Sequence, residues 1–133
     1  MPAATLPLPR PCRPRAGGGR RLPRLRAQVE ALTLARLVCA AAAALPADRA
    51  TVADALRRAA VAIPVHIAEA CARPARADRV RLLDAAWEAL GDLEARLDLA
   101  AVVGLVPAER AAELARHCRW TGRLLHVLVH GAG

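Results

Sequence analysis

Apolar residues recur in the first half of the chain at the spacing of amphipathic helices, in two segments separated by proline. The first segment covers about residues 25–45 and ends at Pro46, which cannot continue a helix. The second starts near Asp48 or Thr51, because either side chain can cap a helix, and it ends before Pro74. We therefore expect two long helices joined by a short connection.

The second half of the chain predicts two further helices. One runs from about Asp78 to Val103 and is closed by Gly104, since glycine readily adopts the left-handed conformation that follows many helices. The other has Pro107 in its first turn and ends at His130. Four helices of similar length with short connections, and no segment that requires a strand, predict an all-α, antiparallel up-down-up-down four-helix bundle.

An apolar rhythm marks each expected helix, and on the last three it defines the core face. On the first helix the rhythm is marked by Leu25, Val29, Leu32, Arg36 and Cys39, around Leu34, Leu37 and Val38. The core stripes of the other helices are Val52, Leu56, Ala59, Ile63 and Ile67; Leu83, Ala86, Leu90, Leu93, Leu97 and Ala100; and Ala111, Leu114, Cys118, Thr121, Leu125 and Leu128.

Two features of the second helix depart from this pattern. Val61 and Val65 point away from its core stripe, which leaves two interpretations open: a surface for a partner, or ordinary exposed valines. Pro64 lies inside the helix, where it removes one backbone donor and crowds the carbonyl of Ala60. We expect a kink at Pro64.

The first 26 residues differ in composition from the rest of the chain. They contain six prolines and a triple-glycine run, so we expect residues 1–26 to form a disordered basic arm and residues 27–131 to form the bundle. The arm holds seven arginines and no acid, whereas the remaining 107 residues hold 13 arginines and 12 acids. Most of the formal charge of +8 therefore belongs to the arm, and a basic surface on the bundle requires local clustering.

A secretory signal is the alternative for the stretch from Arg20 to Ala47, where an apolar segment follows basic residues. Glu30 and Arg36 interrupt this segment, which consists largely of alanine. No segment reaches the roughly 18 apolar residues that a membrane span needs. We therefore expect a cytoplasmic protein without a membrane segment.

The residue inventory disfavours catalysis. The chain contains no Ser, Asn, Tyr or Lys, so a serine nucleophile, a lysine Schiff base and a tyrosine acid are all missing. The four cysteines lie tens of residues apart, which fits neither a zinc knuckle nor a dense disulfide framework. We expect reduced cysteines, no enzymatic activity and no cofactor.

A di-metal carboxylate site is the remaining catalytic alternative, because such sites occur inside four-helix bundles. Helix-compatible spacings occur in His66 with Glu69, Glu113 with His117, His126 with His130, and the acidic row Asp84, Glu88 and Asp92. Di-metal ligands must point into the bundle, but His66 and Glu69 lie off the core stripe, and the pair of histidines near the C-terminus lacks a third ligand. We therefore expect no bound metal.

The fourth helix carries the clearest surface feature. Opposite its core stripe lie five basic or titratable residues, which we call the arginine ridge: Arg116, Arg119, Arg123, His126 and His130. Arginine binds phosphate through paired N–H donors, so such a ridge can follow a nucleic-acid backbone without reading bases. A solvated helix face is the alternative. The absence of acids from this arc favours RNA or another nucleic acid as the ligand.

A second basic cluster surrounds the expected turn between the second and third helices. It consists of Arg73, Arg76, Arg79 and Arg81, with Asp78 as its only acid. A charged loop without a ligand is the alternative. Because Trp87 and Trp120 are the only aromatic residues, we expect binding driven by shape and charge rather than by base stacking. Salt should then weaken binding steeply.

Residues 57–70, with the sequence RRAAVAIPVHIAEA, resemble the hallmark of the four-helix-bundle proteins encoded within intervening sequences of bacterial large-subunit ribosomal RNA genes. That hallmark reads R-R-A-x-x-S-I-P-x-N-I-A-E-G, and the resemblance covers about residues 28–130. The matching positions are Arg57, Arg58, Ala59, Ile63, Pro64, Ile67, Ala68 and Glu69. The sequence departs from the family at Ala62, His66 and Ala70 and, on the third helix, at Glu88-Ala89.

The resemblance implies a homo-oligomer, and pentameric rings are typical of the wider group. That group includes the accessory variability determinants of diversity-generating retroelements, which bind nucleic acid and partner a reverse transcriptase. We therefore expect a non-enzymatic, homo-oligomeric bundle that binds RNA, and an accessory role beside a reverse transcriptase is a further implication. The alternative is a structural or protein-interaction module that does not bind nucleic acid.

The charged hallmark residues are expected to pair within the second helix or between subunits rather than to catalyse a reaction. Glu69 lies one helical turn before Arg73 and on the same side as Arg58. The expected interface or pairing residues are Arg57, Arg58, Val61, Val65 and Glu69.

Overall fold

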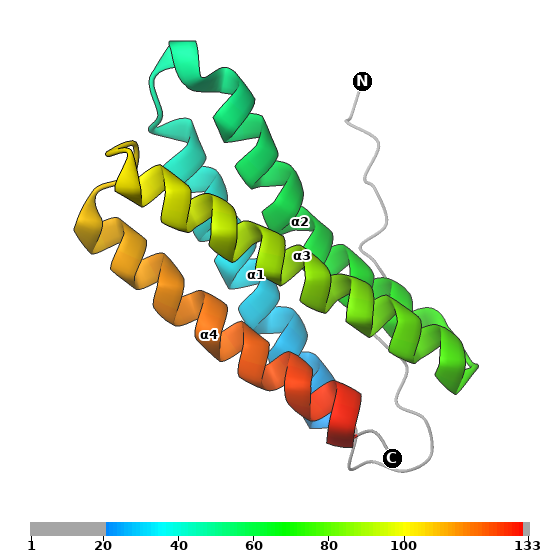
Figure 1. Cartoon of the computed structure of the whole chain (residues 1–133). Coiled ribbons are helices and arrows are strands. Elements are labelled where there is room, and N and C mark those ends of the chain that lie inside the picture. The colour runs from blue at the N-terminus through cyan, green and yellow to red at the C-terminus, as the bar shows by residue number, and fades with distance from the viewer. Residues whose placement is uncertain (1–20, 132–133) are drawn as a thin grey trace, which may run out of the picture.

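The computed structural model describes residues 21–131, which form four long α-helices (Figure 1). Their bounds are α1 Arg21–Ala43, α2 Ala50–Ala72, α3 Arg76–Val102 and α4 Ala108–Gly131, and a 3-10 turn, η2, covers Ala47–Arg49. Consecutive helices run in opposite directions. The predicted all-α, up-down-up-down four-helix bundle is confirmed.

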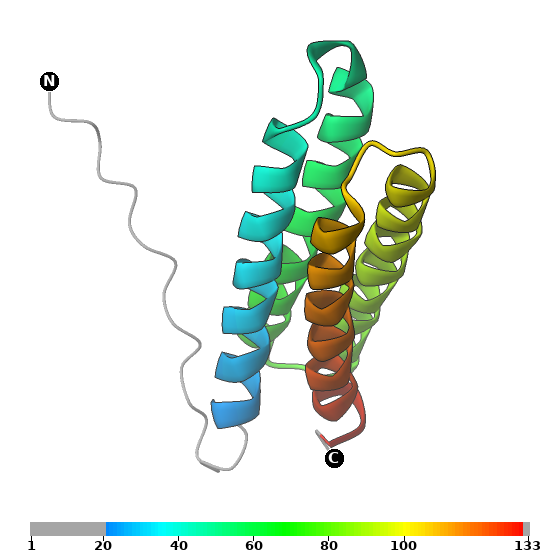
Figure 2. The ribbon, with the colours of Figure 1, turned by 90° about the vertical axis from the view of Figure 1, so that its left-hand side faces the viewer.

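Each helix packs against two others. α2 lies against α1 and α3, and α4 closes the arrangement by packing against the same two helices (Figure 2). The α2–α3 contact is the most extensive, and the α3–α4 contact is the least. The start of α1, the α2–α3 turn and the end of α4 lie at one end of the bundle, which we call the turn end.

Glycine closes α3 as predicted. Gly104 has a φ of +79°, in the left-handed region that a side chain disfavours. This conformation lets the N–H of Leu105 donate to the carbonyl of Ala100 at 2.8 Å and the N–H of Gly104 donate to the carbonyl of Ala101 at 3.1 Å. Both carbonyls belong to the last turn of α3, where no intrahelical donor remains for them.

The second helix starts where it was predicted, between Asp48 and Thr51, but without the predicted cap. α2 begins at Ala50, after the 3-10 turn, and its N-cap residue is Arg49, without a side-chain capping hydrogen bond. The expected cap by Asp48 or Thr51 is therefore wrong. The tight η2 turn, in which the N–H of Arg49 donates to the carbonyl of Pro46 at 2.9 Å, replaces it.

The expected boundary between arm and bundle is also wrong by six residues. α1 begins at Arg21, so residues 21–26 belong to the bundle. Pro23 is compatible with this start because the N–H groups of a helix's first turn have no intrahelical acceptor. The rest of the expected disordered arm, residues 1–20, lies outside the described residues, as do residues 132 and 133.

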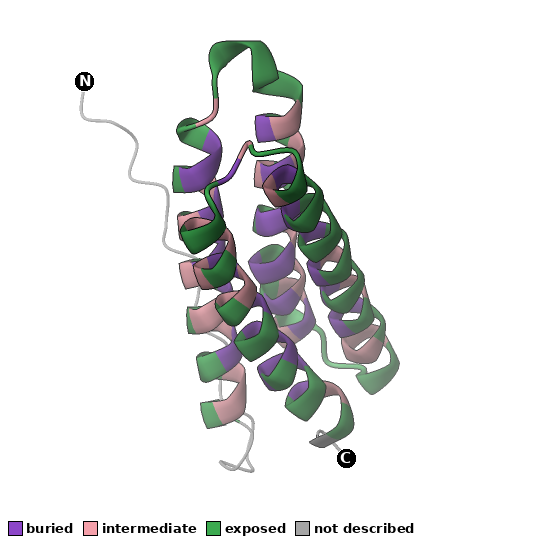
Figure 3. Ribbon diagram, turned by 60° about the vertical axis from the view of Figure 1, so that its left-hand side comes forward, coloured by how far each residue is buried: buried purple, intermediate pink, exposed green. Residues whose placement is uncertain are grey.

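The core stripes predicted for the last three helices are confirmed in their main residues. Buried residues line the inner faces of the helices (Figure 3). Val52 and Ala111, at the ends of two stripes, are only partly buried. The fully buried large side chains of these helices include Leu56, Ile63, Ile67, Leu93, Leu114 and Leu125.

Part of the apolar rhythm that marked the first helix lies on its outer face, whereas Leu34 and Val38 are buried. Leu25, Val29 and Leu32 are each more than half exposed, as is Leu22 one turn earlier. The buried face of α1 consists of Ala27, Ala31, Leu34, Ala35, Val38, Ala41 and Ala42. Alanine contributes little to an apolar pattern, but its small side chain lets helices approach closely. α1 thus has two apolar faces, of which the bundle covers one.

Pro64 is accommodated inside α2, which continues without interruption from Ala50 to Ala72. Its carbonyl accepts a hydrogen bond from Nε2 of Gln28 at 3.3 Å, so the proline segment is also tied to α1. The kink at Pro64 stays a prediction. Val61 and Val65, on either side of it, are 45% and 46% exposed, so they point away from the core as expected.

Candidate nucleic-acid interface

The arginine ridge lies on the exposed face of α4, as predicted. Arg116, Arg119 and Arg123 are all exposed, and so are His126 and His130. The three arginines form no ion pair with any residue in the range 21–131. They span about 10 Å along the helix axis. Three guanidinium groups are therefore available to an anionic ligand on one side of the bundle.

α3 brings acids close to one part of this ridge. The arc on α4 itself contains no acid, but Glu94 of α3 interacts electrostatically with Arg119. Burial raises the pKa of Glu94, Asp98 raises it further, and the guanidinium of Arg119 lowers it. The sequence could not indicate this proximity, because the acids and the arginine belong to different helices. Arg119 is thus the ridge arginine whose charge is partly compensated.

The arginines of the α2–α3 turn have different roles. Nη1 of Arg79 donates hydrogen bonds to the carbonyls of Arg73 at 3.3 Å and Pro74 at 2.6 Å, so Arg79 stabilises the turn. Arg81 lies 3.7 Å from Asp78 in an exposed ion pair, a class that contributes at most about 1 kcal/mol. Arg73 and Arg76 are exposed. These two side chains are the best placed of the cluster to meet a ligand.

Arginines that were expected in the arm join this cluster at the turn end. Arg24 of α1 lines a small cavity of about 30 Å³ together with Arg76 and Arg79 of α3. Cys71 and Leu128 contribute to the same cavity, so four helices meet there. Arg21 and Arg26 occupy the adjacent turns of α1. These arginines were assigned to the arm only because the predicted start of α1 was too late in the chain.

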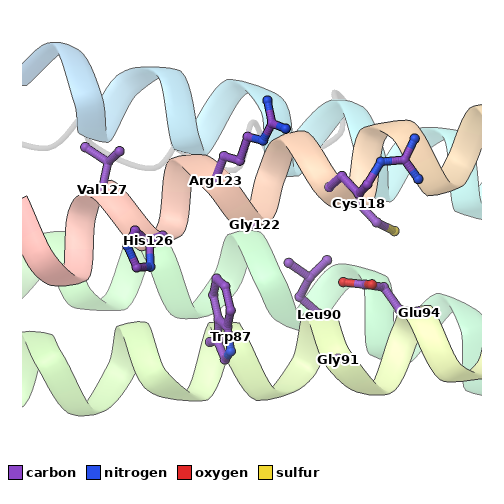
Figure 4. A pocket seen from close by; sticks show the side chains of 10 residues that line it. Trp87, Leu90, Gly91, Glu94, Cys118, Gly122, Arg123, His126 and Val127 are labelled. Carbon is purple, nitrogen blue, oxygen red and sulfur yellow. The ribbon is translucent and has the colours of Figure 1, made fainter.

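A groove of about 600 Å³ runs between α3 and α4, beside the arginine ridge. Trp87, Leu90 and Glu94 extend from α3 toward α4 in Figure 4. The groove is open beside Gly91 of α3, where a Cβ would meet nothing within 4 Å, whereas Gly122 of α4 packs against the side chains of Leu90 and Trp87. Arg119, Arg123 and His126 line its α4 side. We call this feature the Trp87 groove.

Two polar contacts join α4 to α1. Nδ1 of His117 lies 2.7 Å from Oε1 of Glu30, and both side chains are mostly buried. The guanidinium of Arg26 lies over the ring of Trp120, 5.6 Å from its centroid. This geometry permits a cation–π interaction, which is worth about 0.5–1 kcal/mol at an exposed site. His117 therefore pairs across helices rather than with Glu113, the partner suggested by sequence spacing.

The hallmark residues on α2 form different pairs from those expected. Arg57 forms an ion pair with Asp54 at 3.0 Å, and Oε1 of Glu69 lies 3.9 Å from Nδ1 of His66. Within the described part of the chain Glu69 forms no ion pair with Arg58 or Arg73. The expected Glu69–Arg73 pair is thus wrong, since residues 72 and 73 are already at the end of α2, where Arg73 has extended backbone.

Among residues 21–131, no three His, Cys, Asp or Glu side chains gather in a way that could hold a metal ion. His126 and His130 lie with ring centroids 4.2 Å apart. No helix in the same range is long and apolar enough to cross a membrane. Cys39 and Cys118 are free thiols, whereas Cys12 lies outside the described residues.

Cys118 should be the least reactive of these thiols. Burial raises its pKa to about 12 from an ordinary value of 9, and the nearby charges of Glu94 and Asp98 add to this. At pH 8 the thiolate fraction of Cys118 is then about a thousandfold lower than that of an ordinary thiol. A more basic thiolate is also a stronger nucleophile, so the alkylation of Cys118 should be roughly 30-fold slower than that of an ordinary thiol. Timed iodoacetamide labelling with peptide mass spectrometry measures this.

The half-exposed Cys39 is the internal comparison, and urea-unfolded protein is the second control. Both cysteines should react at similar rates once the chain is unfolded, because the shift in pKa requires the folded environment. Labelling of Cys118 as fast as Cys39 in the native protein would contradict the burial that α3 and α4 impose.

Sequence reasoning missed the Trp87 groove and the Glu30–His117 contact. Two patterns could have indicated the groove. Gly91 and Gly122 both lie within helices, where glycine is unfavourable by about 1 kcal/mol relative to alanine. Trp87 directly follows the core position Ala86, which places a large aromatic side chain beside the core face. Nothing in the sequence could have paired Glu30 with His117, because they are 87 residues apart.

Comparison with known proteins agrees with the hallmark on α2. A family model described as 23S rRNA-intervening sequence protein matches residues 24–127. The match includes α2, α3 and most of α1 and α4, with the arginines of the ridge and of the turn cluster. No curated protein matches the chain. The relation to the accessory proteins of diversity-generating retroelements stays a prediction.

Proposed function

Because the chain belongs to the family of 23S rRNA-intervening sequence proteins, we propose that it is a non-enzymatic, homo-oligomeric protein of the cytoplasm that binds RNA along the arginine ridge. The observation that carries this proposal is the set of three exposed arginines on α4 that have no ion-pair partner among residues 21–131. Unpaired guanidinium groups gain the most from a phosphate, because no internal ion pair has to be broken first.

The turn-end arginines extend the proposed surface. Arg73 and Arg76 are exposed, and Arg24 lies beside Arg76 around a shared cavity. These three arginines lie at the turn end of the bundle, and so does the C-terminal part of the ridge. An RNA segment bound along α4 can therefore continue toward the α2–α3 turn. Phosphate contacts at both places would give affinity without base specificity.

Salt should weaken this binding steeply. Each phosphate contact contributes about 0.7 to 0.9 to the slope of log K against log salt, so three ridge contacts alone lower the affinity roughly 20- to 40-fold between 50 and 200 mM salt. Fluorescence anisotropy with a labelled structured RNA at several salt concentrations measures the slope. Absence of binding at 50 mM salt would overturn the proposed function.

Self-association is proposed from the outer face of α1. Leu22, Leu25, Val29 and Leu32 form a stripe with 52–63% exposure, opposite the buried face of the same helix. Arg26 borders the stripe beside Leu22, and Arg36 follows it one turn after Leu32. A face of this kind is typical of a helix that packs against another copy. A pentamer is the assembly that the resemblance implies, and Val61 and Val65 on α2 are a second exposed apolar pair for it.

Replacing Leu25 and Val29 together by aspartate should dissociate the oligomer into monomers. Two charges in a desolvated interface are unfavourable by several kcal/mol, whereas the exposed positions should tolerate them in the monomer. Sedimentation or light scattering measures the mass. Val102→Asp is the matched control, because Val102 is 82% exposed but lies on α3, away from the stripe. A monomeric wild type, or an unchanged mass for the double variant, would contradict the proposal.

The exposed apolar stripe also supports the alternative function, a protein-interaction module without nucleic-acid binding. Its partner would then be a different protein rather than RNA, and the arginines would serve solubility and assembly. The salt series separates the two functions, since a module of this kind forms oligomers but has no RNA affinity at low salt.

A further inference from the structure

The Trp87 groove adds a feature that phosphate binding by the ridge does not use. Its volume of about 600 Å³ is within the range of sites that take small ligands, and it lies between two helices of the bundle. Three of its lining residues, Arg119, Arg123 and His126, also belong to the arginine ridge. A nucleic-acid strand held on the ridge therefore passes the mouth of the groove.

The interior of the groove is mostly apolar and is suited to a planar ring. The side chain of Trp87 is 47% exposed and rises from α3 into the space below α4 (Figure 4). Leu90 forms the floor beside it and is 2% exposed. Gly91 has nothing within 4 Å of the position where a Cβ would stand, so the space next to the tryptophan is unfilled. Every nucleobase has a π-face that can stack on an aromatic side chain.

The charged groups are distributed unequally around this apolar interior. Arg119, Arg123 and His126 lie along the α4 side, where a phosphate would be favoured. Glu94 lies on the α3 side, near Cys118. Its carboxyl oxygens can accept hydrogen bonds from the N–H groups on the edge of a base. An aromatic ring with N–H donors on one edge and an anion attached elsewhere matches this arrangement.

We propose that the Trp87 groove receives one unpaired nucleotide of the bound RNA, with its base against Trp87 and its phosphate on Arg119 and Arg123. This inference rests on the RNA-binding function proposed above. The nucleotide must be unpaired, because bases inside a duplex are stacked on their neighbours and cannot enter a groove between helices. An apolar peptide side chain would occupy the interior but would leave the guanidinium groups on the rim without an anion.

The test compares two RNA hairpins that differ by a single bulged guanosine; both are closed by a non-nucleotide linker, so that the paired hairpin contains no unpaired base. Guanosine is chosen because its base presents two adjacent groups with N–H donors. The Trp120→Phe variant leaves Trp87 as the only tryptophan, so its fluorescence reports the groove directly. We expect the bulged hairpin to quench Trp87 and to bind about tenfold more tightly than the fully paired hairpin at the same salt concentration.

Two variants locate the effect in the groove. Gly91→Leu adds a side chain at a position where a Cβ would meet nothing within 4 Å, so that it can fill the space beside Trp87, and Trp87→Ala removes the stacking surface. Each should abolish the tenfold preference while leaving affinity for the paired hairpin unchanged. Ala95→Leu is the matched control, because it adds the same side chain one turn along α3 at an exposed position outside the groove. It should retain the preference.

The outcomes separate this inference from the proposed function. Equal affinity for the two hairpins, or a preference that survives Gly91→Leu, overturns the nucleotide site and leaves ridge binding intact. Failure of both hairpins to bind at low salt overturns ridge binding and the nucleotide site together. Quenching by the paired hairpin as strong as by the bulged one also contradicts the inference, since no base is then free to enter the groove.

Discussion

Replacing Arg116, Arg119 and Arg123 together by alanine is expected to weaken RNA binding about 100-fold. Each exposed guanidinium that meets a phosphate contributes on the order of 1 kcal/mol, and the three are within about 10 Å along one helix face. The slope of log K against log salt should fall by about 2 to 3, because three fewer counterions are displaced. Anisotropy titrations of the variant across the salt series measure both quantities.

A charge-matched variant separates the position of the arginines from their number. Arg49, Arg96 and Arg110 lie outside the ridge and the turn cluster, and replacing all three by alanine removes the same formal charge. This control should lose only a few-fold in affinity through the weaker overall field. Equal losses in the two triple variants would mean that net charge, not the ridge, drives association.

Arg119 should contribute least of the three ridge arginines. Glu94 on α3 already compensates part of its charge, because the guanidinium of Arg119 lowers the pKa of Glu94. Arg116 and Arg123 have no such electrostatic partner in residues 21–131. The single variants of these two residues should therefore account for most of the loss.

Leu93→Ala is expected to lower the free energy of unfolding by about 2–5 kcal/mol. Leu93 is completely buried on α3, within the core to which all four helices contribute. Truncation removes its buried methyl groups and leaves a cavity that the surrounding helices can only partly fill. The melting temperature should fall by roughly 10 °C or more. Urea denaturation at fixed protein concentration measures the change, since self-association would make stability concentration-dependent.

Leu99→Ala is the matched control for this truncation. Leu99 lies on the same helix, less than two turns later, and is 66% exposed. The same chemical change there should alter stability by no more than about 0.5 kcal/mol. A loss at Leu93 as small as at Leu99 would contradict the packing of α3 in the core.

The sequence predicted the helices well where a strong apolar stripe coincided with strong boundary residues. α3 shows this clearly: its leucines recur on one face, and Gly104 ends the helix in the left-handed conformation that the sequence indicated. Prediction was weaker on α1, which has two apolar stripes on opposite faces. The bundle buries the stripe of alanines with Leu34 and Val38, and it leaves Leu22, Leu25, Val29 and Leu32 exposed.

The candidate site was predictable to the extent that it lies on a single helix. Helical geometry alone places Arg116, Arg119 and Arg123 on one face, so their exposure followed from the sequence. Contacts between helices were not predictable in the same way. Glu94 beside Arg119, Arg24 beside Arg76, and Glu30 against His117 all depend on how distant segments are arranged.

The sequence by itself determined the four helices, most of their core faces and the arginine ridge, because these follow from local periodicity and from where proline and glycine interrupt it. The tertiary structure alone decided which face of α1 is buried, which arginines meet at the turn end, and that a groove opens beside Trp87. Those features depend on the distances between helices, which are set by the size of side chains on both partners of each interface.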